Sequence, residues 1–282
     1  MPETIADACD FDLAYQAIAR DPRYAHFINI PERIIRCLDY FHLACNRIEV
    51  IQRLRAYYLF IGVVDHRIDR GELEIGKDIR IDRGELEIGK DILERFNDRI
   101  PCSADRTVGS RVSLVTEVLK QNISDDDYPA VVGKLHELYR AVVAERKAET
   151  ITAYIEQRKV VGRLTAELSY LLIRSFLEGD DREFGAFLER VGAVGCLIDS
   201  VIDLRADTRL GLVSFKPTIG DFLKLLISTL REGLNVSMKH PALLSVFLEA
   251  VSDNVRDRFR AGPQPAPRFI SSSGKDGVPS VV

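Results

Sequence analysis

The sequence lacks the features that mark secreted, membrane-spanning and nucleic-acid-binding proteins. No basic region followed by an apolar one opens the chain, so we expect no signal peptide. No apolar run approaches the ~20 residues of a membrane span. The five cysteines are scattered without a Cys-x-x-Cys pair, and the formal net charge of -4 gives no reason to expect a nucleic-acid partner. These absences predict a reduced, cytoplasmic protein.

Strand patterns are also missing. No alternation of apolar and polar residues extends over a useful length, whereas apolar residues recur at helical spacing along most of the chain. The content of 46% hydrophobic and 29% charged residues is that of a soluble globular protein. We therefore predict an all-α, single-domain helical bundle around a central cavity, formed by residues 1–261. Residues 262–282, rich in Pro, Gly and Ser, are predicted to be a disordered tail.

The expected helices follow from apolar residues three and four positions apart. They cover residues 2–20, 31–64, 104–122, a pattern that continues from 131 to 155, 160–177, 184–204, 219–234 and 241–259. Pro31 stands in the first turn of its helix, where proline is favoured. Asp180 and Asp181 are predicted to cap the helix that follows them.

One segment is duplicated. Residues 67–79, RIDRGELEIGKDI, recur unchanged as residues 80–92. Repeat architectures need several units and tolerate drift, so two identical copies indicate a recent tandem duplication. Because the segment is polar and glycine-rich, we predict that it lengthens a surface loop, which absorbs insertions at little cost. The alternative is that the extra copy extends the preceding helix and forms a lid.

Three aspartates interrupt a helix that is otherwise apolar almost all round. Asp199, Asp203 and Asp207 recur every four residues, so they form a slanted row on one helix face, ~12 Å from first to last. A buried carboxylate must be neutralised by a cation, a hydrogen bond or a raised pKa. Three acids of one sign cannot neutralise each other, and a divalent cation would do so. The alternative is a solvated face, which the apolar surroundings oppose.

A second acidic pair ends another apolar helix. Asp65 and Asp69 follow the run AYYLFIGVV and share one helix face. The duplication creates a competing pair, Asp78 and Asp82, which lies between glycines and is less favoured for that reason. Two acidic faces opposed across a bundle predict more than one Mg²⁺ ion, with coordination positions left for water and phosphate oxygens.

Basic and aromatic residues complete the candidate site. The residues predicted to bind the outer oxygens of a diphosphate are Arg158, Lys159, Arg205, Arg209 and Lys216. For the first two, pairing with Glu149 or Glu156 is the alternative. The aromatic candidates for lining a cavity are Tyr57, Tyr58 and Tyr170, although aromatics at helical spacing also suit a plain core.

With these motifs in place, the chain resembles the class I isoprenoid synthases, the all-α superfamily of terpene cyclases, prenyl-chain synthases and squalene/phytoene synthases. In DHRID, Asp65 and Asp69 match the ends of the Asp-Asp-x-x-Asp motif, with His66 in the second place. The second motif, Asn/Asp-x-x-x-Ser/Thr-x-x-x-Glu, matches in spacing, with Asp203 in the middle place. The resemblance covers the order of parts over residues 31–260.

The resemblance implies a Mg²⁺-dependent terpene synthase or cyclase that ionises a prenyl diphosphate and cyclises or quenches the carbocation. The residues it assigns to catalysis and metal binding are Asp65, Asp69, Asp199 and Asp203, with Asp207 as a further metal ligand. It also implies a diphosphate-sensing arginine on the helix before the second motif. Arg158 and Arg163 suit that place, and we favour Arg158.

Other functions stay open at this point. A prenyl-joining enzyme is the nearest alternative, because Asp203 is closer to the all-aspartate motifs of such enzymes. A chain-elongating enzyme is less favoured, since no Gly-Lys-x-x-Arg-type element and no arginine pair after Asp69 is present. A di-iron bundle needs Glu-x-x-His pairs, which the sequence lacks. The non-enzymatic alternative is a helical interaction protein, and the partner expected besides a substrate is a second copy in a homodimer.

Overall fold

The computed structural model describes residues 13–21, 24–70, 89–90, 92–97 and 110–260. In chain order its labelled elements are α2 (Ala25–Ile28), α3 (Ile30–Tyr40), β1 (Ala44–Cys45), α4 (Arg47–Arg70), α6 (Ser110–Gln121), α7 (Tyr128–Arg146), α8 (Ile151–Ile173), η2 (Arg174–Phe176), β2 (Leu177–Glu178), α9 (Arg182–Leu210), α10 (Ile219–Lys239), η3 (Pro241–Leu243) and α11 (Leu244–Arg260). Residues 13–19 and 92–97 are helical as well. The predicted all-α, single-domain bundle is confirmed.

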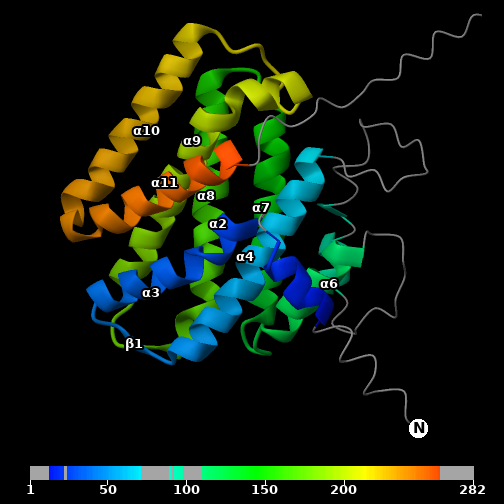
Figure 1. Cartoon of the computed structure of the whole chain (residues 1–282), viewed down its shortest axis with the longest axis vertical. Helices are drawn as coiled ribbons and strands as arrows, with labels where there is room; N and C mark the ends of the chain where they lie inside the picture. Colours follow the sequence, from blue (N-terminus) through cyan, green and yellow to red (C-terminus); the bar gives the residue numbers. More distant parts are fainter. Residues whose placement is uncertain (1–12, 22–23, 71–88, 91, 98–109, 261–282) are drawn as a thin grey trace, which may run out of the picture.

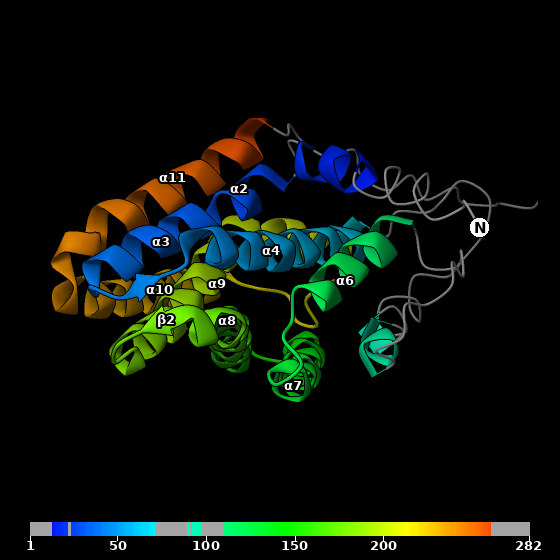
Figure 2. The same cartoon turned by 90° about the horizontal axis from the view of Figure 1, so that it is seen from below.

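The helices form two layers, which Figure 2 shows edge-on. In this view α11, α3 and α4 lie on one side and α7 and α8 on the other, and the second layer continues through α9, which packs on α8, to α10, which packs on α9. Within the second layer, α9 lies between α8 and α10, and α10 forms an outer edge of the molecule (Figure 1). The layers meet where α4 packs on α8.

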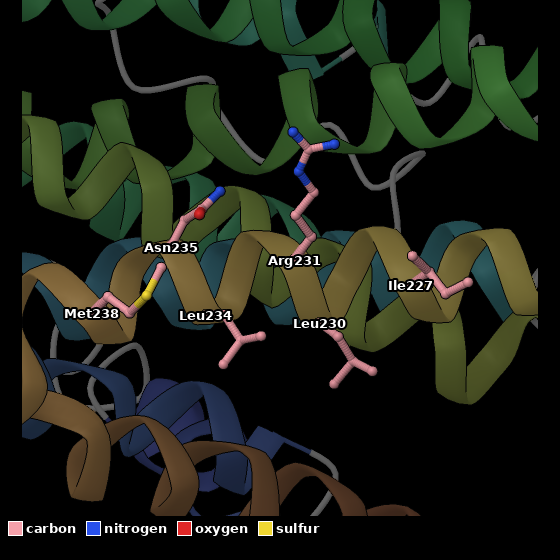
Figure 3. Close-up of a pocket in the computed structure, with 6 residues that line it drawn as sticks. All are labelled: Ile227, Leu230, Arg231, Leu234, Asn235 and Met238. Carbon is pink, nitrogen blue, oxygen red and sulfur yellow. The ribbon is translucent and has the colours of Figure 1, made fainter.

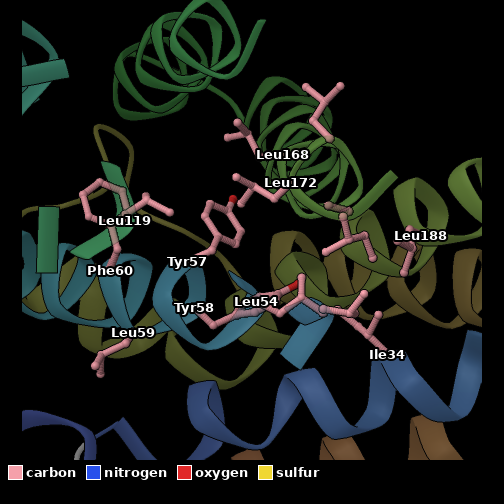
Figure 4. Close-up of a cluster of buried hydrophobic side chains, with 14 of the residues drawn as sticks. Ile34, Leu54, Tyr57, Tyr58, Leu59, Phe60, Leu119, Leu168, Leu172 and Leu188 are labelled. Carbon is pink, nitrogen blue, oxygen red and sulfur yellow. The ribbon is translucent and has the colours of Figure 1, made fainter. Parts of the chain in front are cut away.

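The core between the layers is built from large apolar and aromatic side chains of both (Figure 4). Leu54 and Tyr57 of α4 and Leu168 and Leu172 of α8 are almost completely buried. Removal of this much apolar surface from water is the main stabilising contribution to the fold. A smaller cluster joins α8, α9 and α10 through residues such as Leu197.

Helices α8 and α9 approach each other unusually closely at two glycines. A Cβ atom added to Gly162 would fall on the carbonyl oxygen of Gly192, and one added to Gly192 would fall on the carbonyl oxygen of Gly162. Only glycine permits backbones to approach this closely. The contact lies one turn beyond Arg158 on α8 and less than two turns before Asp199 on α9, so it sets how far these side chains must reach.

Several expected boundaries needed correction. The continuous pattern predicted from 131 to 155 is in fact two helices, because α7 ends at Arg146 and the Thr150 side chain accepts a hydrogen bond from the Ala153 amide, starting α8. Asp181 occupies the N-cap position of α9, but its side chain makes no capping hydrogen bond. Helix α9 runs six residues beyond the predicted end and stops at Gly211, which has a φ of 74°.

One feature, a short strand pair, lies outside the helical patterns that the sequence displays. Strands β1 and β2 form a two-residue antiparallel pair, with Ala44 opposite Glu178 and Cys45 opposite Leu177. Within the described residues this is all the sheet structure there is. Pro31 does lie in the first turn of α3, as predicted.

The duplicated segment is described only at its two ends. Its first four residues continue α4 to Arg70, and residues 71–88 and 91, which include Asp78 and Asp82, lie outside the described residues. At the far end, Gly89 and Ile92 are buried in helical backbone, and Ile92 belongs to the main core. The end of the second copy is therefore packed rather than part of a surface loop, because Ile92 supplies apolar surface beside Leu93 and Phe96. The predicted tail, 262–282, also lies outside the described residues.

Candidate functional site

The candidate site lies where the C-terminal half of α9 faces α4, α8 and the end of α7. Arg158 of α8 lies at its centre, with its side chain 17% exposed. Its Nη2 donates to Asp199 Oδ2 at 3.0 Å and to the Cys196 carbonyl oxygen at 3.2 Å. Its Nη1 donates to Glu145 Oε1 at 3.3 Å. One guanidinium thus connects α7, α8 and α9.

The electrostatics of the site follow from burial and from its several acids. Burial raises the pKa of Asp207 to about 7, against the opposing effect of the Arg158 guanidinium. The carboxylates of Asp199, Asp65 and Glu145 add to that rise. Burial also raises the pKa of Glu145, although Arg158 opposes it. A carboxyl group that holds its proton near neutral pH marks a place where a further cation would be favourable.

The first acidic motif meets the second through Asp65. This residue lies on α4 and is exposed, and its carboxylate acts electrostatically on both Asp207 and Cys196 of α9. Asp203 is partly buried on the same helix. The backbone of Asp69 belongs to α4, but its side chain lies outside the described part of the chain. The structure therefore brings together the second motif and the first residue of the first motif.

The carboxylate oxygens of the site are the type of ligand that magnesium prefers. Mg²⁺ prefers oxygen ligands and is normally bound by one or two carboxylates together with water and phosphate oxygens. Asp65, Asp199, Asp203 and Asp207 offer such oxygens from two helices. Among the described side chains, however, no group of three or more His, Cys, Asp or Glu residues stands close enough to hold a metal ion by itself. The described carboxylates therefore suit Mg²⁺ in ligand type, but they form no closed protein cage for it.

The other predicted basic residues differ from Arg158 in their partners or in their exposure. Lys159 points to the other side of α8, where its Nζ donates to Glu156 at 3.1 Å and to Glu232 of α10 at 2.9 Å. The remaining three, Arg205, Arg209 and Lys216, are exposed. The alternative pairing of Lys159 with Glu156 is therefore observed, whereas Arg158 pairs with Glu145 instead of Glu149.

The predicted aromatic residues belong to packed parts of the bundle. Tyr57 is fully buried and donates to the Thr165 carbonyl oxygen at 2.9 Å. The Tyr58 hydroxyl and Ser169 Oγ are hydrogen-bonded at 2.9 Å. Tyr170 is partly buried, with its ring edge-to-face to Phe184. A cavity lined by these residues stays a prediction. Burial raises the pKa of Tyr58 to about 12, so its hydroxyl stays neutral.

A pocket of about 340 Å³ lies elsewhere, on the exposed apolar face of α10 (Figure 3). Leu230 and Leu234 line it from one side of the helix, and Arg231 and Asn235 point to the opposite side in the same view. No residue of the acidic motifs lines it.

Sequence reasoning missed Glu145. It lies in the last turn of α7, in a charged stretch that gave no motif, and its role depends on the packing of α7 against α8. No sequence signal singles it out, because Arg146, Lys147 and Glu149 follow it closely.

Comparisons with known proteins add no assignment. No protein-family model matches the chain, and neither a curated protein nor a solved structure does. In the described part of the chain, no helix is both long enough and apolar enough to cross a membrane.

Proposed function

We propose that the protein is a Mg²⁺-dependent class I terpene synthase or cyclase that acts on a prenyl diphosphate. The observation that supports this function best is the acidic site on α9: Asp199 lies against a buried arginine, and Asp207 has its pKa raised to about 7. Partly buried acids beside a largely buried guanidinium suit a ligand that brings both cations and phosphate oxygens. The cytoplasm is the proposed location, as the sequence predicts.

Each part of the site has a proposed task. Asp65, Asp199, Asp203 and Asp207 hold Mg²⁺, and Asp69 joins them by its place in the first motif. When bound, Mg²⁺ supplies Lewis-acid stabilisation of the leaving diphosphate. Arg158 donates hydrogen bonds to diphosphate oxygens through its planar fork. The packed layers of the bundle exclude water, which would otherwise quench a carbocation.

The test is to incubate the full chain with Mg²⁺ and prenyl diphosphates of graded chain length and to analyse the products by mass spectrometry. We expect Mg²⁺-dependent release of diphosphate and a terpene product. Asp199→Asn should abolish turnover while the fold persists, and Asp180→Asn, which changes an exposed acid outside the site, should not. Turnover by the Asp199→Asn variant at the wild-type rate would refute the assignment.

A prenyl-joining enzyme is the second candidate. The observation that favours it is that the two motifs, DHRID and DSVID, share the form Asp-x-x-x-Asp. Products of the same assay separate the two activities, because a joining enzyme forms a longer chain from two prenyl units. The exposed apolar residues of α10 favour the third candidate, a helical interaction protein, which would show neither product nor any dependence on Mg²⁺.

A further inference from the structure

Arg158 occupies the position of a cation at the second acidic motif. Its Nη2 lies 3.0 Å from Asp199 Oδ2, within a charge-assisted hydrogen bond. The Asp199 side chain is 35% exposed and thus reachable from solvent, whereas Arg158 is 17% exposed. A metal ion that arrives at Asp199 must therefore compete with Arg158 for the same carboxylate.

A second acid holds the other end of the guanidinium. Glu145 accepts from Arg158 Nη1 at 3.3 Å through Oε1 and at 3.5 Å through Oε2. Its side chain is 14% exposed. Arg158 would stay anchored to α7 through this pair if its bond to Asp199 were broken.

The third nitrogen of the guanidinium is not satisfied. Arg158 Nε is buried and has no hydrogen-bond partner. A buried N–H without an acceptor is costly, so an oxygen ligand at this place would be favourable. Arg158 thus has one donor without an acceptor and one that a metal at Asp199 would release.

We propose that Glu145, Arg158 and Asp199 form a cation-operated switch in which Glu145 is the positioning residue. Without metal, Arg158 neutralises Asp199. A divalent cation on Asp199 displaces Arg158 Nη2, and Glu145 holds the guanidinium in place while its released N–H groups bind an oxyanion such as diphosphate. The binding of the oxyanion, the anion half of the switch, rests on the proposed function. The displacement of Arg158 by a cation, the cation half, can be measured without a substrate.

The switch makes binding of the two ligands cooperative. A cation that frees Arg158 raises the affinity of the site for the anion, and by linkage the anion raises the affinity for the cation by the same factor. A permanent structural ion pair would instead leave the affinity for metal independent of how well Arg158 binds Asp199.

The test uses Mn²⁺ alone, with free Mn²⁺ measured by electron paramagnetic resonance during titration of the full chain. Arg158→Lys keeps the positive charge, but a single ammonium lacks the fork that bonds to both acids. As a weaker competitor, it should let Mn²⁺ bind about five-fold more tightly. Arg163→Lys is the matched control on the exposed side of α8 and should bind as the wild type does.

The outcomes separate the switch from the proposed function. Wild-type binding of Mn²⁺ with equal or weaker binding by Arg158→Lys overturns the switch alone. No binding of Mn²⁺ by the wild-type chain removes the metal site and contradicts both proposals.

A second variant covers the case in which Arg158→Lys does not fold, as judged by circular dichroism. In Glu145→Gln, Arg158 loses its ion pair with Glu145 and binds Asp199 more strongly. Mn²⁺ binding should therefore weaken about five-fold. Glu156→Gln removes one acidic charge from the other side of α8 and is the control for charge alone. Equal Mn²⁺ affinities in these two variants overturn the switch.

The anion half is read by calorimetry with inorganic diphosphate at saturating Mn²⁺. Arg158→Lys should bind diphosphate about ten-fold more weakly than the wild type, although it binds the metal more tightly. Tighter binding of both ligands, or weaker binding of both, contradicts the switch.

Discussion

Two regions of the molecule reverse the usual rule that charged side chains are exposed and apolar ones are buried. One is the contact between α8 and α9, and the other is the outer, exposed apolar face of α10. Between α8 and α9, a guanidinium and its acidic partners are largely enclosed. On α10, large apolar side chains are exposed: Ile219, Leu223, Ile227, Leu230, Leu234 and Met238 are 53% to 89% accessible. Buried charge is costly unless it is paired, and an extended exposed apolar stripe is unusual in a monomer.

The difference shows what each region contributes. The α8–α9 contact tolerates charge because Gly162 and Gly192 bring the backbones together, so Arg158 can reach a carbonyl and two acids across three helices. Helix α10 instead packs on α9 through a narrow set of buried residues, among them Leu225 and Val236, and leaves its other apolar side uncovered. The close approach of two helix backbones determines the contacts of the first region. In the second region, α10 carries apolar residues both on the side that packs on the bundle and on a side that is exposed.

The largest effect is expected from Gly162→Val. The new side chain would fall on the Gly192 backbone, which cannot move as a flexible side chain does. We expect a loss of about 3 kcal/mol or more in the free energy of unfolding, with loss of the Arg158 contacts. Urea denaturation measures it. Gly195→Ala on α9 is the control: its Cβ meets nothing within 4 Å, so a gain of up to ~1 kcal/mol is expected. Equal stability of the two variants would mean that the close contact does not form.

The next effect compares buried and exposed leucines. Leu197 is completely buried between α8, α9 and α10, so Leu197→Ala should cost ~3 kcal/mol in the free energy of unfolding. Leu230 on the outer face of α10 is 56% exposed, and Leu230→Ala should change stability by less than ~0.5 kcal/mol. Chemical denaturation of both variants tests the comparison. A large loss for Leu230→Ala would show that the outer face of α10 is covered in solution.

A smaller effect is expected from Asp207, and it depends on pH. The folded-state pKa of about 7 exceeds the ordinary value of 3.8, so the native state keeps a proton that the unfolded state loses. Stability should therefore fall as pH rises from ~4 to ~7, by on the order of 2 kcal/mol. Asp207→Asn should flatten this part of the profile.

Unfolding free energies measured at pH 4.5, 5.5, 6.5 and 7.5 would check this profile. Asp180→Asn is the control, because its ion pair with Arg182 lowers the pKa of Asp180 to about 2, outside the window. The same slope in Asp207→Asn as in the wild type would contradict the burial of this carboxyl group.

Much of the fold could be predicted from periodic apolar residues, and the exceptions have local causes. Helix α9 was expected because its apolar residues surround the axis, but its end was set by Gly211. The separation of α7 from α8 depended on Thr150, a residue of the N-cap type inside a charged stretch. The β1–β2 pair was out of reach, because two residues are too few for an alternating pattern.

The candidate site was predictable in part for a similar reason. The spacing of Asp199 and Asp207 on one helix gave the acidic face, since positions on one helix follow from sequence distance alone. The pairing of Arg158 with Glu145 could not be predicted, because it depends on how α7 packs against α8. Lys159 follows Arg158 on α8 and is therefore turned by about 100° around the helix axis, which directs it to Glu232 of α10.

The central claim, that the acidic face of α9 binds Mg²⁺ together with a diphosphate, is tested most directly by the melting temperature of the full chain. A ligand that binds only the native state raises the melting temperature. We predict a rise of several degrees with Mg²⁺ and inorganic diphosphate together, a smaller rise with either alone, and none in an Asp199→Asn/Asp203→Asn double variant. An unchanged melting temperature in the wild type, or an equal rise in the double variant, would contradict the account.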